Sequence, residues 1–269
     1  MKEVPVLLQQ GFDLLTIAGG GFGSTDFRLS TDRGVSKYYD IYSTNNTTAG
    51  LQDNCQATLN VGGQNLVQDT NVPYWTSTYQ YGRDHKFRVR ASYSDGQTGT
   101  LTLDGTNTPN SAQEQTAQVI VFYETPAHKM YVQNFRMPFG QGLKRRQYYH
   151  QVAQNAVGGS ISSSSFTAPR NNGSIGAVGV LTVVPLVDAV NFVNNEQHRT
   201  LVTITVDGIE IIQNVSATYY QAATGRDYYV QPIQIQPGAT FTIQTQTQNN
   251  IAAAQQFQVY LTLTDKRLF

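Results

Sequence analysis

The sequence predicts an all-β protein built from two similar antiparallel β domains in tandem. Three observations lead to this fold class. Landmark residues recur in the same order about 140 positions apart, several segments alternate apolar and polar residues with period two, and glycine-containing turn signals separate these segments with no long helical pattern between them. Short strands punctuated in this way are typical of antiparallel sandwiches and barrels.

The clearest landmark of the duplication is the tripeptide Gly-Arg-Asp, which occurs at residues 82–84 and again at residues 225–227. Four further matches keep the same order: Gly34-Val35 with Gly179-Val180, segment 58–67 with segment 203–212, Asp95-Gly96 with Pro237-Gly238, and Gln118-Val119 with Gln258-Val259. The offset between the members of each pair becomes steadily smaller along the chain, as small deletions in surface loops would produce. The matches divide the chain into a first domain of residues 1–135, with its N-terminal segment, and a second of residues 136–269, with the connecting segment.

Within each copy, the alternation of side chains predicts half-buried strands at residues 87–91, 202–206, 241–244 and 257–264. Gly62-Gly63 and Asp207-Gly208 have the composition of two-residue hairpin turns, in which both central residues take positive φ. Residues 119–123 are apolar at successive positions, so we expect this strand to be covered on both faces, by the other half of the chain or by another subunit.

Two segments show no counterpart in the repeat, residues 1–23 and residues 135–172. The first ends in Gly19-Gly20-Gly21-Phe22-Gly23, which we interpret as a flexible joint. The second contains residues 143–152, which lack turn residues and predict a helix of two or three turns. Residues 158–165, rich in glycine and serine, predict a loop.

The composition limits the possible partners. Charged residues form 13% of the chain, about half the usual share, and 18 basic residues balance 18 acidic ones. A polar but uncharged surface suits extensive protein contact, because burying Gln, Thr or Tyr requires far less desolvation than burying Lys or Glu. With no basic arm, we expect no direct binding of nucleic acid. No segment has the length of a signal peptide core or a transmembrane helix, so synthesis in a cytosol is expected.

The residues that usually carry catalysis are scattered. The four histidines stand alone in the sequence, no nucleophile elbow or phosphate-binding loop is present, and the single cysteine, Cys55, is best interpreted as a small buried thiol. No spacing typical of a metal site occurs. We therefore expect a protein that is not an enzyme and has no catalytic residues.

Two groups of residues are candidates for contacts. The repeated tripeptide is either a turn that leads into a strand, or it places Arg83, Asp84, Arg226 and Asp227 against a neighbouring subunit. The basic cluster Lys144, Arg145 and Arg146, beside two tyrosines, is either a solvated linker or a membrane-facing patch that contacts lipid head groups.

Two tandem β domains in a chain rich in Gln, Asn, Thr and Tyr, with no catalytic constellation, resemble the double jelly-roll major capsid proteins of membrane-containing icosahedral phages. The corticovirus major coat protein is the nearest in length. The resemblance implies two eight-stranded antiparallel jelly-roll β-barrels, a homotrimer with a pseudo-hexagonal outline, and an icosahedral shell over an internal membrane. It also implies synthesis in the host cytoplasm and a final location in the capsid of the virion.

The same resemblance implies the partners: other copies of the chain, neighbouring trimers, other capsid proteins such as a vertex protein, and peripheral contact with the internal lipid membrane. The apolar segment 4–17 would then lie at the membrane-facing end. Calcium is implied without ligands that we can assign, and no organic cofactor is implied.

A second hypothesis is a carbohydrate-binding module or receptor-binding spike domain, in which Tyr74, Trp75, Tyr79 and Tyr81 form an aromatic platform for sugar. A β-barrel hydrolase is a third.

Overall fold

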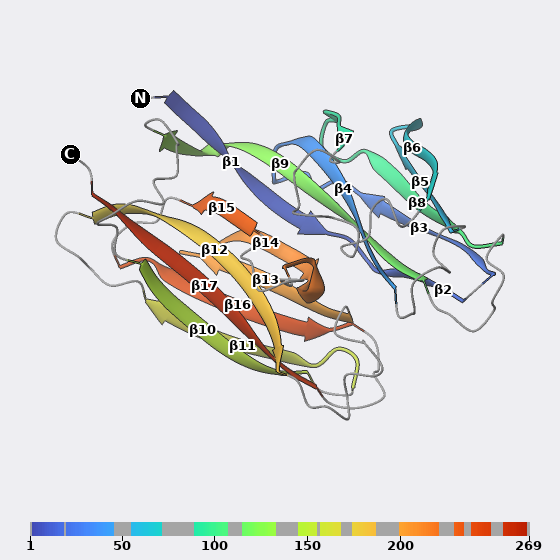
Figure 1. Ribbon diagram of the computed structural model, residues 1–269. Coiled ribbons are helices and arrows are strands. Elements are labelled where there is room, and N and C mark those ends of the chain that lie inside the picture. Colours follow the sequence, from blue (N-terminus) through green and yellow to red (C-terminus); the bar gives the residue numbers. More distant parts are fainter. Residues whose placement is uncertain are drawn as a thin grey trace.

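The structure is a computed structural model. It describes residues 2–18, 20–45, 55–71, 89–106, 115–132, 145–154, 157–167, 174–186, 199–220, 229–233, 238–248 and 255–267 (Figure 1). Almost all of this part of the chain consists of β-strands, with one short 3-10 helix, η5 (Ala217–Tyr220).

The first half of the chain forms a barrel of two facing sheets. Its strands are β1 (Lys2–Gly11), β2 (Leu15–Ile17), β3 (Phe22–Arg28), β4 (Val35–Asn45), β5 (Gln56–Val61), β6 (Gln64–Asn71), β7 (Val89–Arg90), β8 (Thr98–Asp104) and β9 (Gln115–Val132). One sheet has the order β1-β9-β4-β7, with the short β2 also paired to β9, and the other has the order β3-β8-β5-β6. Counting β1 and β2 as one interrupted strand, this is the eight-stranded, two-sheet arrangement of a jelly roll.

The second half repeats the arrangement. Its strands are β10 (Arg145–Gln154), β11 (Ile161–Thr167), β12 (Ser174–Leu186), β13 (Thr200–Val206), β14 (Ile209–Ser216), β15 (Tyr229–Ile233), β16 (Thr240–Thr247) and β17 (Gln255–Arg267). Their orders are β10-β17-β12-β15 and β11-β16-β13-β14, so each strand occupies the place of its counterpart in the first half. The predicted fold class, two tandem eight-stranded antiparallel jelly rolls, is confirmed.

The repeated hairpin shows the duplication at the level of backbone angles. Gly62 and Gly63 have φ of 58° and 81°, and Asp207 and Gly208 have φ of 48° and 83°. Both turns therefore have the predicted positive φ at both central residues. These turns join β5 to β6 and β13 to β14, which confirms the match of segment 58–67 with segment 203–212.

The match of Gly34 with Gly179 is wrong in register. Ile41 is paired with Val119 and Val183 with Val259, so Val183 of β12 is the counterpart of Ile41 of β4. Gly34 precedes β4, whereas Gly179 lies within β12. Two Gly-Val dipeptides in a chain rich in both residues match by chance.

The two segments without a counterpart in the sequence pattern are in fact part of the repeat. Residues 2–28 form β1, β2 and β3, and residues 145–167 form β10 and β11, which have the same places in the two barrels. The expected helix at 143–152 is wrong, because β10 is hydrogen-bonded to β17 over ten consecutive residue pairs. Helix propensity is a weak preference that a complete ladder of this kind overrides. The expected serine-rich loop is wrong for the same reason, since β11 pairs with β16 along its whole length.

The apolar segment 4–17 contributes to the core of the first barrel. Leu8, Leu15 and Ile17 are buried within it. Packing in this core accounts for the hydrophobicity of these three residues.

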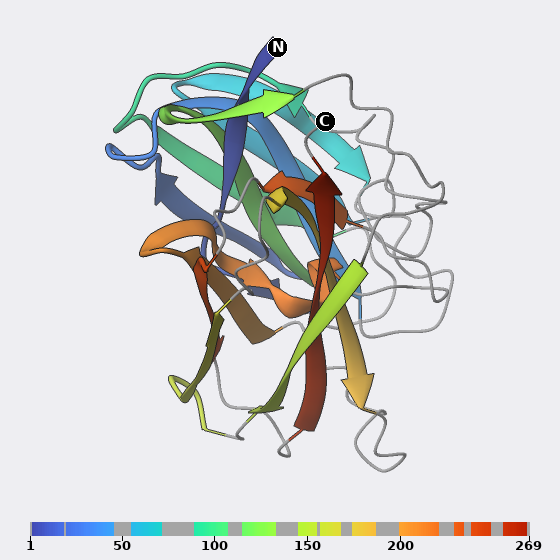
Figure 2. The ribbon, with the colours of Figure 1, turned by 90° about the vertical axis from the view of Figure 1, so that its left-hand side faces the viewer.

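The barrels are joined edge to edge through β1. This strand pairs antiparallel with β9 and parallel with β14, so one sheet runs through both barrels in the order β11-β16-β13-β14-β1-β9-β4-β7, and β2, paired to β9, is its ninth strand. Figure 1 shows β1 and β9 above β14, and Figure 2 shows the two barrels stacked along the joint. A single hydrophobic cluster extends through both barrels.

Candidate assembly interface

The predicted contact residues are only partly within the described chain. Arg83, Asp84, Arg226 and Asp227 lie outside the described residues, as does Lys144. Arg145 and Arg146 begin β10, where they pair with Thr264 and Leu263 of β17. Successive positions of a strand belong to opposite faces of its sheet, so positions 145 and 146 belong to opposite faces of the sheet that contains β10. A solvated linker would not separate them in this way.

The joint between the barrels is organised by one buried glutamine. The Gln118 side-chain amide donates hydrogen bonds from Nε2 to the carbonyl oxygens of Phe12 and Asn214, both at 2.8 Å, and its Oε1 accepts one from the backbone N–H of Ser216 at 2.9 Å. Gln118 is fully buried. It therefore satisfies, from a fully buried position, backbone groups of β14 and of the chain after β1.

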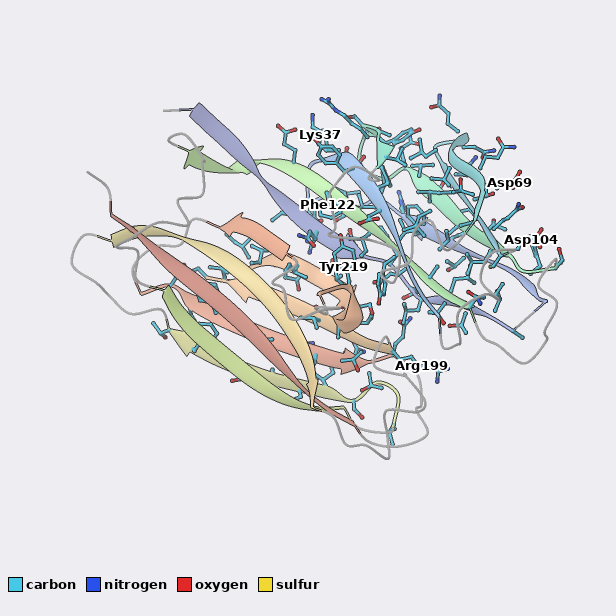
Figure 3. The ribbon with its side chains drawn as sticks, in the orientation of Figure 1. Lys37, Asp69, Asp104, Phe122, Arg199 and Tyr219 are labelled. Carbon is cyan, nitrogen blue, oxygen red and sulfur yellow. The ribbon has the colours of Figure 1, made fainter. Side chains whose placement is uncertain are left out.

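Charged and aromatic contacts extend the joint on both sides of Gln118. The Arg33 guanidinium lies 2.6 Å from the Glu210 carboxylate, and the Tyr219 hydroxyl donates to Asp40 at 2.9 Å. The Tyr219 ring also meets Tyr42 edge to face, with ring centroids 5.6 Å apart. Figure 3 shows Tyr219 in η5, where the second barrel faces β4 of the first.

Strand β9 is covered on both faces, as its sequence predicts. Val119, Val121 and Tyr123 belong to the face of the first core, and Ile120 and Phe122 to the opposite face, yet all five side chains are at most 1% exposed. Burial raises the pKa of Tyr123 to about 12, and its hydroxyl accepts a hydrogen bond from the backbone N–H of Ser30. The packing of the two barrels on each other therefore covers this strand within one chain.

Each barrel has an outer wall, which is the face of one sheet that points away from the core. The first wall belongs to the sheet β3-β8-β5-β6, and the second wall to the strands β11-β16-β13-β14. The first wall presents Asp26, Arg28 and Asp104 among threonines and asparagines, and it is held by hydrogen bonds such as Thr100 to Asp26 at 2.7 Å and Asn60 to Asn65 at 2.8 Å. In the second wall, the outward positions of β11, β16 and β13 are Ile161, Ser163, Ser165, Thr167, Thr203, Thr205, Thr240, Thr242, Gln244 and Gln246. None of these positions is charged, so this part of the wall could be covered by protein with little loss of solvation of ionic groups. On β14, Glu210 lies opposite Thr205 and is paired with Arg33.

The walls carry a duplicated β-bulge that the sequence pattern does not reveal. Asp69 and Asn214, at matching places in β6 and β14, both have positive φ (47° and 51°). In each, the backbone N–H donates to a threonine Oγ1 on the neighbouring strand at 3.1 Å, and this hydroxyl donates to the Asx side chain: Thr58 for Asp69, and Thr203 for Asn214. The only signal in the sequence is a Thr and an Asx at equal spacing in both copies, and such a pair is too common to stand out.

Asp32 and Asp104 are hydrogen-bonded to nearby residues, and the described residues form no metal site. A hydrogen bond from Ser30 holds the pKa of Asp32 below its usual value, and hydrogen bonds from the Thr106 hydroxyl and backbone do the same for the pKa of Asp104. Among the residues that the structure describes, no three His, Cys, Asp or Glu side chains come close enough together to bind a metal ion. The described part of the chain also contains no helix with the length and hydrophobicity that crossing a membrane requires.

Comparison with known proteins gives structural similarity only. Neither the protein-family models nor the curated protein sequences yield a match. Among solved structures, the PBCV-1 virus capsid is 11% identical with a TM-score of 0.25, covering 98% of this chain and 95% of that one. The Sulfolobus turreted icosahedral virus structure is 12% identical with a TM-score of 0.24, covering 99% and 61%. PNGase F, a glycosylasparaginase from Flavobacterium meningosepticum, is 13% identical with a TM-score of 0.26, covering 100% and 97%.

These TM-scores all lie below 0.5, and the similar structures include both capsids and an enzyme. The assignment of the class therefore depends on the strand order of the chain itself, which defines a double jelly-roll protein.

Proposed function

We propose that this chain is a viral major capsid protein, of the type found in membrane-containing icosahedral phages and closest to the corticovirus coat protein. Three copies would form a capsomer of pseudo-hexagonal outline, and capsomers would tile a shell. The observation that carries the proposal is the joining of two equivalent jelly rolls into one body by a shared sheet. A trimer of such chains has six similar units around its axis, which is what packing in a hexagonal array requires.

The surface supports the same proposal. Outer walls made mainly of Ser, Thr, Gln and Asn can be buried against neighbouring proteins with desolvation of only a few charged groups, such as Asp26, Arg28 and Asp104 of the first wall. The residues that the structure arranges at the joint and on the walls therefore support a role in assembly.

Light scattering and negative-stain electron microscopy of the purified protein test the proposal. We expect a mass of three chains and particles with a hexagonal outline. A stable monomer that binds to a glycan array would instead support the carbohydrate-binding alternative, whose aromatic residues at 74–81 lie outside the described chain. A monomer that neither assembles nor binds glycans would contradict both.

The finer partners are part of the proposal and have separate tests. For lipid, flotation with anionic liposomes should weaken when Lys144, Arg145 and Arg146 are replaced by Gln, because each basic residue near such a surface contributes about 1 kcal/mol. For calcium, chelation should lower the temperature at which assembled shells dissociate, while leaving the isolated chain unchanged. For subunit contacts by the repeated tripeptide, replacing Arg83 and Arg226 by Ala should weaken the oligomer.

A further inference from the structure

The turn between the first two strands of each jelly roll is the same in both barrels. In the first barrel, the backbone N–H of Gly21 donates to the carbonyl of Ala18 at 2.9 Å, and in the second the N–H of Ser160 donates to the carbonyl of Val157 at 3.4 Å. Gly20 and Gly159, each directly before the donor, have φ of 71° and 83°. We call residues 18 and 20–22 the first corner and residues 157–161 the second corner.

Both corners are anchored to the barrel rather than free to move. Gly105 donates from its N–H to the carbonyl of Gly21 at 2.8 Å, and Thr247 donates to the carbonyl of Ser160 at 3.0 Å. Gly105 follows β8 and Thr247 ends β16, which are equivalent strands of the two barrels. The glycine run, whose composition predicts a flexible joint, is thus one of two equivalent, hydrogen-bonded turns.

Each corner presents large apolar side chains to solvent. Phe22 is 65% exposed, and at the equivalent position in the second barrel Ile161 is 59% exposed. Their equivalence follows from the ladders, since Phe22 pairs with Asp104 and Ile161 with Gln246, near the ends of the equivalent strands β8 and β16. Val157, in the second corner, is 67% exposed.

This exposure is concentrated at the corners. Of the five large apolar side chains that are exposed in the described part of the chain, three lie in the two corners. Single exposed apolar residues are normal on protein surfaces, but recurrence at the same position of a duplicated fold is not explained by composition. The two residues differ in identity and share only apolar bulk, and neither packs into its own core.

We propose that the two corners are the points at which a second copy of this chain docks, each inserting its apolar side chains against the neighbouring copy. The proposal rests on the proposed function as a coat protein. A second copy is the occupant because only a repeating assembly uses both barrels in the same way, so that one kind of contact serves both corners. The outward positions of β11, β16 and β13 beside Ile161 are uncharged, and they can be buried in such a contact without desolvating an ionic group. Apolar side chains on a rigid turn lose little conformational freedom on docking, which is typical of residues that dominate an interface.

Cysteine labelling tests this docking without disrupting it. The native Cys55 is fully buried, and burial raises its pKa to about 11, so it stays unreactive at neutral pH. Phe22→Cys and Ile161→Cys should then react with a maleimide at least about tenfold more slowly in the assembled protein than after dissociation to monomers. Gln68→Cys, at an exposed position of β6, measures the general shielding within the particle. Equal reaction rates of both corner variants in the two states would overturn the proposal.

Polar substitution provides the second test. The double variant Phe22→Ser with Ile161→Ser should need at least about tenfold higher protein concentration for half-maximal assembly, with an unchanged circular dichroism spectrum. Ile209→Ser is the matched control, since Ile209 is an exposed apolar residue outside the corners. Unchanged assembly of the double variant would overturn the corner inference alone. A wild-type chain that never assembles would instead remove the proposed function.

Discussion

At the scale of single residues, Gln118 has the largest expected effect on stability. Its amide, on a fully buried side chain, satisfies three backbone groups from two segments that are distant in sequence. Replacing it by leucine keeps the volume similar but leaves these groups without their partner. We expect Gln118→Leu to lower the free energy of unfolding by about 2–4 kcal/mol, measured by urea denaturation.

The matched control is Gln244→Leu, at a half-exposed position of the second wall. There water can replace any hydrogen bond, so the change should stay within about 0.5 kcal/mol. Equal effects of the two substitutions would mean that the hydrogen bonds of Gln118 do not hold the joint.

The buried acidic groups predict a loss of stability in alkali. Burial raises the pKa of Cys55 from 9.0 to about 11 and that of Tyr123 from 10.0 to about 12. For both groups the folded protein favours the neutral form. Their contribution to stability is therefore complete below the unfolded pKa and is lost as the pH rises through the folded value. We expect the urea midpoint to fall between about pH 9 and pH 12.

Cys55→Ala isolates one of these groups. Its stability should decline less steeply than that of the wild type between about pH 9 and pH 11, whatever the loss of packing does to the absolute value. Identical pH slopes for the two proteins would contradict the assignment to Cys55.

At the scale of elements, the two β-bulges predict a paired result. In each, one threonine hydroxyl holds the backbone N–H of an Asx residue at positive φ. Thr58→Val and Thr203→Val should each lower stability in thermal unfolding. The second should do so more, by about 1–2 kcal/mol, because the bond of Thr203 is partly buried while that of Thr58 is exposed.

Thr205→Val is the control for the bulges, because Thr205 is the next outward threonine of the same strand and its partner on β14, Glu210, does not have positive φ. Valine suits a strand, so we expect little change. If Thr205→Val is as damaging as Thr203→Val, the general environment of the wall is responsible and the bulge is not.

The elements also show which strands can be predicted from the sequence. Strands β13 and β16 are predictable from alternation because one face of each is buried and the other is polar. Strands β10 and β11 are not, because their local composition, basic in one and serine-rich in the other, favours other structures. Their ladders with β17 and β16 come from residues far along the chain and are not visible in a local pattern.

At the scale of the whole molecule, the duplication is predictable and the joint is not. Turn residues and the Gly-Arg-Asp tripeptide recur at countable offsets, whereas the joint depends on single long-range pairs such as Arg33 with Glu210 and Gln118 with Asn214. No pattern in the sequence indicates that β1 belongs to both barrels, since its hydrophobicity is that of any buried strand. The two corners cannot be predicted from the sequence for a related reason. A glycine run has the same composition in a flexible joint and in an ordered turn.

The shared strand predicts that the two barrels unfold together. Because β1 completes one sheet of the first barrel and extends a sheet of the second, neither barrel can lose it alone. We expect a single calorimetric transition for the isolated chain. Gly11→Ala should broaden or split this transition, since a Cβ at this position would lie 2.4 Å from the carbonyl oxygen of Asn214 and 2.7 Å from Nε2 of Gln118, and β1 must then move away from β14.

Gly63→Ala separates this effect from the general cost of changing a glycine. Gly63 has φ of 81° and open space around its Cα, so alanine there strains the backbone by about 1 kcal/mol without touching the joint. It should lower the melting temperature while one transition remains. Two transitions in the wild type would show that the barrels unfold independently. One transition of unchanged shape in Gly11→Ala would show that the continuous sheet is not what couples them. Coupling matters for the proposed function, because a capsomer can transmit a contact made at one barrel to the other only if the chain behaves as one body.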